Sequence, residues 1–287
     1  MSATSVLQIR PLAAPFGAEV LDIDLSQPME AAAFERLHQA WMRHLVLVFR
    51  DQTSISPEDQ IAFSARFGEL LPAQIKKYAL KGHPAIGVVS NAKDETGEYI
   101  GIPNSGRNWH TDFQFDRRPP DATFLVSREL PAEGGNTLYA DMYAAYDALP
   151  REMRERIAHM RVIHSRVKAW PVLYPDRAPL RPEDAAQMPD VSHPMVRTHP
   201  VTLRKALYIG GNMAIGIEGM ADGPAMRLIH ELRDFAVGPR FTYSHRWRTG
   251  DAVLWDNRCT MHCATSYDDT KYRRVMHRTS MGPAVPV

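Results

Sequence analysis

Alternating apolar and polar positions open the chain. Residues 6–12 (VLQIRPL) and 18–25 (AEVLDIDL) both alternate, and a proline- and glycine-containing segment separates them. Alternation of this kind is typical of half-buried strands, so the pattern predicts an opening hairpin. Apolar residues at helical spacing then predict an amphipathic helix over 29–44, and the short apolar run 45–50 (LVLVFR) predicts a buried strand.

Further along, polar residues predict the starts of helices. Ser56 followed by Pro57 indicates a helix N-terminus. Asp141 and Asp222 are each in a position to cap a helix, over 142–149 and about 224–236 respectively. Strands are predicted wherever aromatic and β-branched residues gather between turns, at residues 86–91, 122–127, 241–247, 252–256 and 273–280.

These predicted elements indicate a mixed α+β fold. Strands are spread over the whole length and helices gather early and mid-chain, which is not the regular alternation of a doubly wound α/β protein. A β-barrel or jelly-roll core that carries helical insertions fits the pattern better. No linker, internal repeat or low-complexity tract marks a boundary, so we expect one domain over 1–287.

The composition of the chain argues against several classes of function. The chain has 287 residues, 44% of them hydrophobic, with a formal net charge of +1 and no clustered basic stripe, so nucleic acid is not expected as a partner. No run of 18 apolar residues predicts a membrane span, and the N-terminus does not resemble a signal peptide. The only cysteines, Cys259 and Cys263, make no disulfide framework. The cytoplasm is therefore the expected compartment.

The stretch NWHTDFQF contains the first candidate for chemistry, His110 and Asp112. On a strand, side chains two positions apart point to one face, so the two can reach one metal ion together. A third ligand is needed, and His262 in WDNRCTMH has the best context, with His199 and His245 also possible. The two cysteines lie at odd offsets from His262 and would face the other way, as buried fillers.

Two more segments have unusual polar residues. If 271–280 (KYRRVMHRTS) is a strand, Arg274 and Arg278 share one face, about 13 Å apart. They are either charges on a solvated edge strand or inward cations that need anionic partners. The segment GGNT contains a double glycine followed by Thr137, and alone it would be an ordinary turn.

In this order, the segments resemble the taurine dioxygenase / dichlorophenoxyacetate dioxygenase family. The similarity runs nearly end to end, through GAEVLDIDL, DQIAFSARFGEL, WHTDFQF, GGNTLYADMYAAYDAL, VRTHP, WDNRCTMH and RRVMHR. The resemblance implies a double-stranded β-helix (jelly-roll) core, an Fe(II)- and 2-oxoglutarate-dependent dioxygenase that consumes O2, and a homo-oligomer, either a dimer or a tetramer.

The resemblance also implies roles for single residues. His110, Asp112 and His262 match the iron ligands. Thr137 and Arg274 match the residues that bind the far carboxylate of 2-oxoglutarate, and strand parity also favours Arg274 over Arg273. Arg278 matches the position that holds the anionic group of the substrate. No histidine follows RFGEL, where taurine dioxygenase has one that contacts the sulfonate. Basic Lys76 and Lys77 lie in that region instead, which makes Lys76 a second candidate for binding the anionic group of the substrate.

We therefore expect hydroxylation of a small organic carboxylate or sulfonate, with an aryloxyalkanoate-like acid as one candidate. Ether or C–S cleavage would follow, and succinate and CO2 would be released. Two alternatives remain at this point. A zinc hydrolase can use two histidines and an aspartate, but it leaves Thr137, Arg274 and Arg278 without a role. A non-catalytic jelly-roll binding module has no need of an open metal site.

Overall fold

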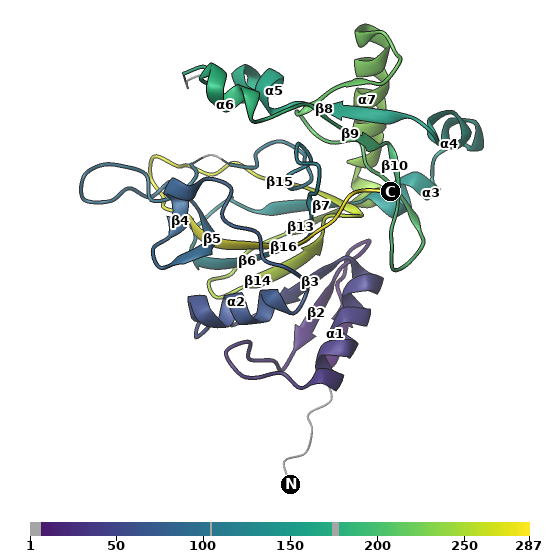
Figure 1. The fold of residues 1–287 in the computed structure, drawn as a ribbon. Coiled ribbons are helices and arrows are strands. Elements are labelled where there is room, and N and C mark those ends of the chain that lie inside the picture. Colours follow the sequence, from purple (N-terminus) through teal and green to yellow (C-terminus); the bar gives the residue numbers. More distant parts are fainter. Residues whose placement is uncertain (1–6, 104, 174–177) are drawn as a thin grey trace.

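A computed structural model describes residues 7–103, 105–173 and 178–287 and shows a mixed α+β protein, as predicted (Figure 1). The helices are α1 (Ala31–His44), α2 (Pro57–Ala65), α3 (Met142–Asp147), α4 (Arg151–Ile157), α5 (Arg166–Leu173), α6 (Pro182–Ala186), α7 (Asp222–Ala236) and the 3₁₀ turns η1 (Lys76–Tyr78) and η2 (Pro239–Phe241). The strands are β1 (Gln8–Pro11), β2 (Ala18–Leu21), β3 (Val46–Phe49), β4 (Ala79–Leu80), β5 (His83–Ser90), β6 (Pro120–Glu129), β7 (Thr137–Asp141), β8 (Arg161–His164), β9 (Val191–Pro194), β10 (Val196–Thr198), β11 (Lys205–Leu207), β12 (Ala214–Ile217), β13 (Thr242–His245), β14 (Ala252–Asp256), β15 (Thr260–Ala264) and β16 (Val275–Pro283).

The N-terminal elements are those that the sequence predicts. Strands β1 and β2 form an antiparallel hairpin, and α1 and β3 fall within the predicted helix and strand. Helix α2 begins with a capping box: the Ser56 hydroxyl accepts from the backbone N–H of Asp59, whose carboxylate accepts from the backbone N–H of Ser56. This arrangement satisfies two N–H groups that the helix itself cannot pair.

Eight strands form the main sheet, in the order β1-β2-β3-β14-β6-β16-β5-β4. Its central strands are buried on both faces, which explains their continuous apolar sequences. Leu254 of β14 and Phe124 of β6 pack toward α1 and α2, which cover one face (Figure 1). Trp255 and Val253 point to the opposite face, into a second apolar core.

On that opposite face lies a three-stranded sheet, β13-β7-β15, and beyond it an inserted region with α3 to α7 and the remaining strands (Figure 1). As predicted, Asp141 caps α3, since its carboxylate accepts from the N–H groups of Tyr143 and Ala144. The prediction that Asp222 caps a helix is wrong. Asp222 is the first residue inside α7, and Ala221 occupies the cap position without a side-chain hydrogen bond.

No helix in the described part of the chain combines the length and apolar character needed to cross a lipid bilayer.

Candidate metal centre

Two histidines from distant segments meet between the two sheets. The backbone N–H of His110 donates to the carbonyl of His262 (3.0 Å), and the N–H of His262 donates back to the carbonyl of His110 (2.8 Å). This reciprocal pair makes a single β-bridge, and the two ring centroids lie 4.2 Å apart. With Asp112, the two residues bring three ligand atoms within 4.8 Å of one another.

Asp112 reaches this group by a turn and not along a strand, contrary to the expected strand geometry. His110 forms only the isolated bridge, and the chain turns from Asp112 onward, with Phe113 in the left-handed region (φ 52°). The turn aims the carboxylate inward, 3.9 Å from Nε2 of His110 and 3.9 Å from Nε2 of His262. The turn and the single bridge therefore bring the three residues together without a regular strand at residues 110–112.

The environment sets the charge of each ligand. Burial acts to raise the pKa of Asp112, but the Arg278 guanidinium, which pairs with it at 3.3 Å, holds that pKa below its usual range. Burial, together with His110, lowers the pKa of His262 to about 3, so its imidazole is neutral at physiological pH. The site therefore presents a carboxylate and an uncharged imidazole, both able to bind a cation.

The tautomer of His110 also suits a ligand. Its Nδ1 lies 2.7 Å from the carbonyl oxygen of Asn108, which has only lone pairs, so Nδ1 carries the proton. Nε2 is then left with a free lone pair on the side of Asp112. Two imidazoles and one carboxylate, with open positions beside them, fit non-haem iron(II).

Arg274, which the resemblance assigns to 2-oxoglutarate, is buried just before β16 and forms no ion pair within the described ranges. Its Nε has no hydrogen-bond partner, and burial lowers the pKa of its guanidinium to about 10, a value at which it is still charged near neutral pH. Arg273, by contrast, is 59% exposed and pairs with Glu129. Strand parity thus identified the inward arginine.

Gly135, the second residue of the double glycine, lies beside this arginine. Gly134 and Gly135 both have positive φ (74° and 64°), and a Cβ on Gly135 would lie 3.4 Å from Cδ and Nε of Arg274. Thr137 follows on β7, where its hydroxyl accepts a hydrogen bond from Trp247 Nε1 (3.0 Å). Because the indole is only a donor, the hydroxyl proton of Thr137 stays available for an acceptor such as a carboxylate.

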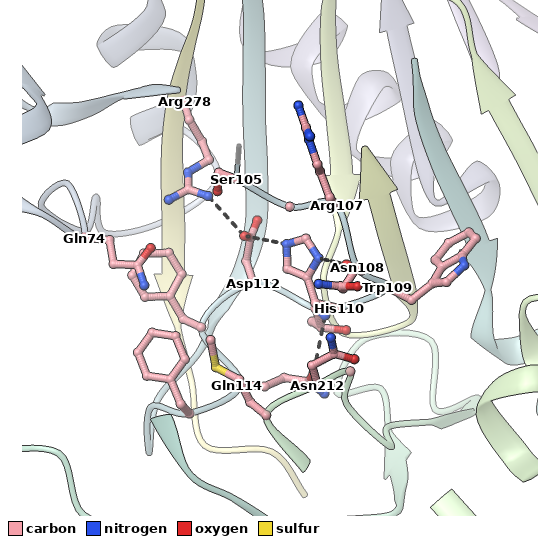
Figure 2. Close-up of a pocket in the computed structure, with 16 residues that line it drawn as sticks. Gln74, Ser105, Arg107, Asn108, Trp109, His110, Asp112, Gln114, Asn212 and Arg278 are labelled. Carbon is pink, nitrogen blue, oxygen red and sulfur yellow. Dashed lines mark hydrogen bonds and ion pairs between the residues drawn. The ribbon is translucent and has the colours of Figure 1, made fainter. Parts of the chain in front are cut away.

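A cavity of about 110 Å³ opens beside two of the three ligands, His110 and Asp112 (Figure 2). Arg278 points into it and donates from Nη1 to Asp112 Oδ1 (3.3 Å). Its guanidinium also lies 5.6 Å from the ring centre of Phe113, which stacks on Phe115 with centroids 5.9 Å apart. The cavity thus combines a cation, an aromatic wall and the ligand group. Its lining is completed by Gln74, Ser105, Gly106, Arg107, Asn108, Trp109, His110, Thr111, Gln114, Gly211, Asn212 and Met213.

The structure does not bring Lys76 into this lining. Lys76 is exposed in η1, and its neighbour Lys77 pairs with Glu98 at 2.9 Å. From this segment, Gln74 is the residue that lines the cavity. Sequence reasoning did not single out Gln74, because its amide lacks the charge that made the lysines candidates.

His199 and His245, the other possible ligands, are engaged elsewhere. Nε2 of His199 lies 3.0 Å from Asp256, and its Nδ1 accepts two backbone N–H groups. Nε2 of His245 lies 3.2 Å from Asp251. Cys259 and Cys263 are buried and unbridged, as expected of fillers.

The inserted region supplies a wall that sequence reasoning missed. Gly211, Asn212 and Met213 lie against the segment that precedes His110, and a Cβ on Gly211 would overlap the carbonyl oxygen of Trp109. The double glycine at 210–211 was a signal for such a close approach. Its partner lies about a hundred residues earlier in the chain, so the sequence alone did not identify it.

Comparisons with known proteins agree with this geometry. The model of the family described as "Taurine catabolism dioxygenase TauD, TfdA family" matches residues 8–280. The chain is 33% identical over 285 residues to an (S)-phenoxypropionate/alpha-ketoglutarate-dioxygenase of Sphingobium herbicidovorans, covering 96% of this chain and 94% of the relative.

It is also 33% identical over 290 residues to an alpha-ketoglutarate-dependent 2,4-dichlorophenoxyacetate dioxygenase of Cupriavidus pinatubonensis, covering 96% and 98% of the two chains. Among solved structures, AAD-2 in complex with Mn(II) and N-oxalylglycine is similar, with a TM-score of 0.83, 31% identity and 98% of each chain covered.

The contact between Gly211 and Trp109 predicts that Gly211→Ala lowers the free energy of unfolding by about 3 kcal/mol, because a backbone carbonyl cannot move aside as a side chain can. It should also weaken metal binding, since Trp109 precedes His110. Gly216→Ala is the matched control: nothing lies within 4 Å of its added Cβ. Denaturant unfolding of the three proteins checks this, and equal losses for both alanines would contradict the assigned contact.

Proposed function

Since the chain belongs to the taurine catabolism dioxygenase TauD, TfdA family, we propose that it hydroxylates a small organic anion at an iron centre held by His110, Asp112 and His262. It is an enzyme, a dioxygenase that depends on iron(II), 2-oxoglutarate and O2. The observation that carries the proposed site is the convergence of the three ligand atoms within 4.8 Å at the wall of a cavity.

When iron(II) is bound, it supplies the redox chemistry that couples decarboxylation of 2-oxoglutarate to hydroxylation of the substrate, with succinate and CO2 as products. The residues of this chain bind and orient the reactants. Asp112 provides the anionic ligand, and His110 and His262 provide neutral ones. Three ligands on one side leave the remaining positions open for the co-substrate and oxygen.

The far carboxylate of 2-oxoglutarate is the partner we assign to Arg274. A buried guanidinium without an acidic neighbour is costly unless an anion pairs with it. Thr137 would add one neutral hydrogen bond, from the hydroxyl proton that its contact with Trp247 leaves available. A zinc hydrolase would leave this buried cation without a role, and a simple binding module would have no need of the three metal ligands.

The substrate that we propose is an aryloxyalkanoate-like carboxylate. Arg278 would pair with its carboxylate and the Phe113–Phe115 wall would hold its ring, since the cavity combines a cation with stacked aromatic side chains. The two relatives are named for such acids. Hydroxylation of a carbon next to an ether oxygen gives an unstable product, so the ether would then cleave. Lys76 has no part in this proposal.

We further propose that the main sheet and the β13-β7-β15 sheet together make a jelly-roll core, within a single domain over 1–287. Two sheets that face each other around the ligand group support this (Figure 1). The resemblance of the sequence to a family of dimers and tetramers supports a homo-oligomer. The two unbridged cysteines support a reducing compartment such as the cytoplasm.

The metal site is tested with iron(II) and 2-oxoglutarate in the absence of oxygen. We expect a weak charge-transfer band in the visible spectrum, which requires iron and keto acid to bind together. His110→Ala, Asp112→Ala and His262→Ala should each lose the band and the turnover while circular dichroism stays near that of the wild type. A band that persists in His262→Ala would contradict the proposed ligand set.

Arg274→Ala should raise the apparent Michaelis constant for 2-oxoglutarate roughly 10- to 100-fold, because a hydrogen bond to a charged group contributes about 1.5–3 kcal/mol. Thr137→Val should raise it less, since one neutral donor is lost. Arg273→Ala is the matched control, because that side chain is exposed and pairs with Glu129. Succinate formation measures all three. A large effect in Arg273→Ala with none in Arg274→Ala would overturn the assignment.

Arg278→Ala should keep the anaerobic band but bind the substrate weakly, and succinate formation should become uncoupled from product. Replacing the substrate carboxylate by an amide should cost the wild type a large share of its affinity and the variant little, as expected when a direct pair is already lost. A substrate panel of aryloxyalkanoates and sulfonates, read out as succinate and product, gives the constants. Equal losses in both proteins would show that the anion binds elsewhere.

A further inference from the structure

A chain of hydrogen bonds runs from the core of the main sheet to Asp112. Trp255 Nε1 donates to Asn257 Oδ1 (3.0 Å), Asn257 Nδ2 donates to Thr123 Oγ1 (2.9 Å), and Thr123 Oγ1 donates to Asp112 Oδ2 (2.7 Å). All four side chains are buried. This series of hydrogen bonds thus ends on the only carboxylate of the ligand group.

The chemistry of its first member fixes the direction of every bond. The indole N–H of Trp255 can only donate, so the atom of Asn257 that faces it must be the amide oxygen. The amide nitrogen of Asn257 is then the group that faces Thr123, and it donates to the Thr123 hydroxyl. With one lone pair used in this way, the hydroxyl points its single proton at Asp112.

Backbone pairing holds these hydrogen-bonded side chains in place. Trp255 of β14 and Thr123 of β6 are directly opposed partners in the main sheet, and the backbone N–H of Asn257 donates to the carbonyl of Asp121 (2.8 Å). The Trp255 ring also lies against a second member of the ligand group, with its centroid 4.8 Å from that of His262. The rigid sheet therefore contacts two of the three ligands through these side chains.

We propose that Thr123, Asn257 and Trp255 are positioning residues, which fix the orientation of the Asp112 carboxylate so that it binds the metal. This inference rests on the proposed function, in which Asp112 is a ligand. Thr123 occupies one lone pair of Oδ2 and stops the carboxylate from rotating about its Cβ–Cγ bond. Oδ1, which also accepts from Arg278, then lies 3.9 Å from Nε2 of His110, and Oδ2 lies 3.9 Å from Nε2 of His262. Trp255 acts at a distance, by selecting the orientation of the Asn257 amide.

The experiment titrates Mn²⁺ alone into the full-length protein and measures the dissociation constant by calorimetry, with no turnover involved. Thr123→Val removes the hydroxyl at nearly constant volume and should weaken Mn²⁺ binding roughly 10- to 100-fold, the usual effect of losing a partner of a ligand. Thr123→Ser keeps the hydroxyl and should restore most of the affinity. Trp255→Phe allows the Asn257 amide to flip, and it should cause a smaller loss of Mn²⁺ affinity.

Thr279→Val is the matched control. Thr279 is equally buried and its hydroxyl is also hydrogen-bonded, to Ser64, but on the α2 side of the same sheet. It should lower stability and leave the Mn²⁺ constant unchanged. Thr123→Val with a wild-type constant, or Thr279→Val with the same loss, would overturn the proposal. If Thr123→Val does not fold, Trp255→Phe decides, because an unchanged constant there also overturns it.

Failure of the proposed function gives a different result. Wild-type protein that does not bind Mn²⁺, or Asp112→Ala that binds it as tightly as the wild type, would remove Asp112 from the ligand set. Wild-type binding that depends on Asp112 but not on Thr123 or Trp255 would overturn only the positioning role.

Discussion

The site depends on one reciprocal pair of backbone hydrogen bonds, between His110 and His262. The two residues come from opposite halves of the chain, and neither regular strand pairing nor a disulfide brings them together. On its other edge His262 pairs with Tyr139 of β7, so the bridge attaches the His110 segment to the small sheet. Asp112 is attached to the main sheet through Thr123. The ligand group therefore forms only when both sheets are assembled.

The buried charges of the molecule fall into two kinds. Arg258 and Asp256 satisfy each other at 2.7 Å, and His199 completes the group, so these charges stabilise the fold without a ligand. Arg274 has no ion-pair partner within the described residues, and the partly buried Arg278 pairs with Asp112, a candidate metal ligand, and packs against Phe113. Buried polar groups are nearly always satisfied in folded proteins, so the unpaired Nε of the buried Arg274 supports the proposal that an anion binds there.

Several features of the fold and the site could be predicted from the sequence, because they depend on local chemistry. The capping box at Ser56 and the alternation that turns Arg274 inward need only neighbouring residues. The turn at Phe113, which aims Asp112, has no sequence signal, because a phenylalanine in the left-handed region is held there by its surroundings. The wall formed by Gly211 depends on a contact with Trp109, and a single sequence does not reveal contacts between distant segments.

The candidate anchoring residues and the side chains that shape the cavity lie on different kinds of backbone structure. Thr137, His262 and Arg278 lie on strands of the two sheets, while Phe113, Phe115 and Asn212 lie outside helices and strands, on connecting segments. Substitutions in connecting segments disturb a folded core much less than substitutions in its strands. Natural variation can therefore alter the shape of the cavity while the reaction stays the same. Enzymes built in this way can acquire new substrates through a few loop mutations, and a laboratory search for new activities would begin with those positions.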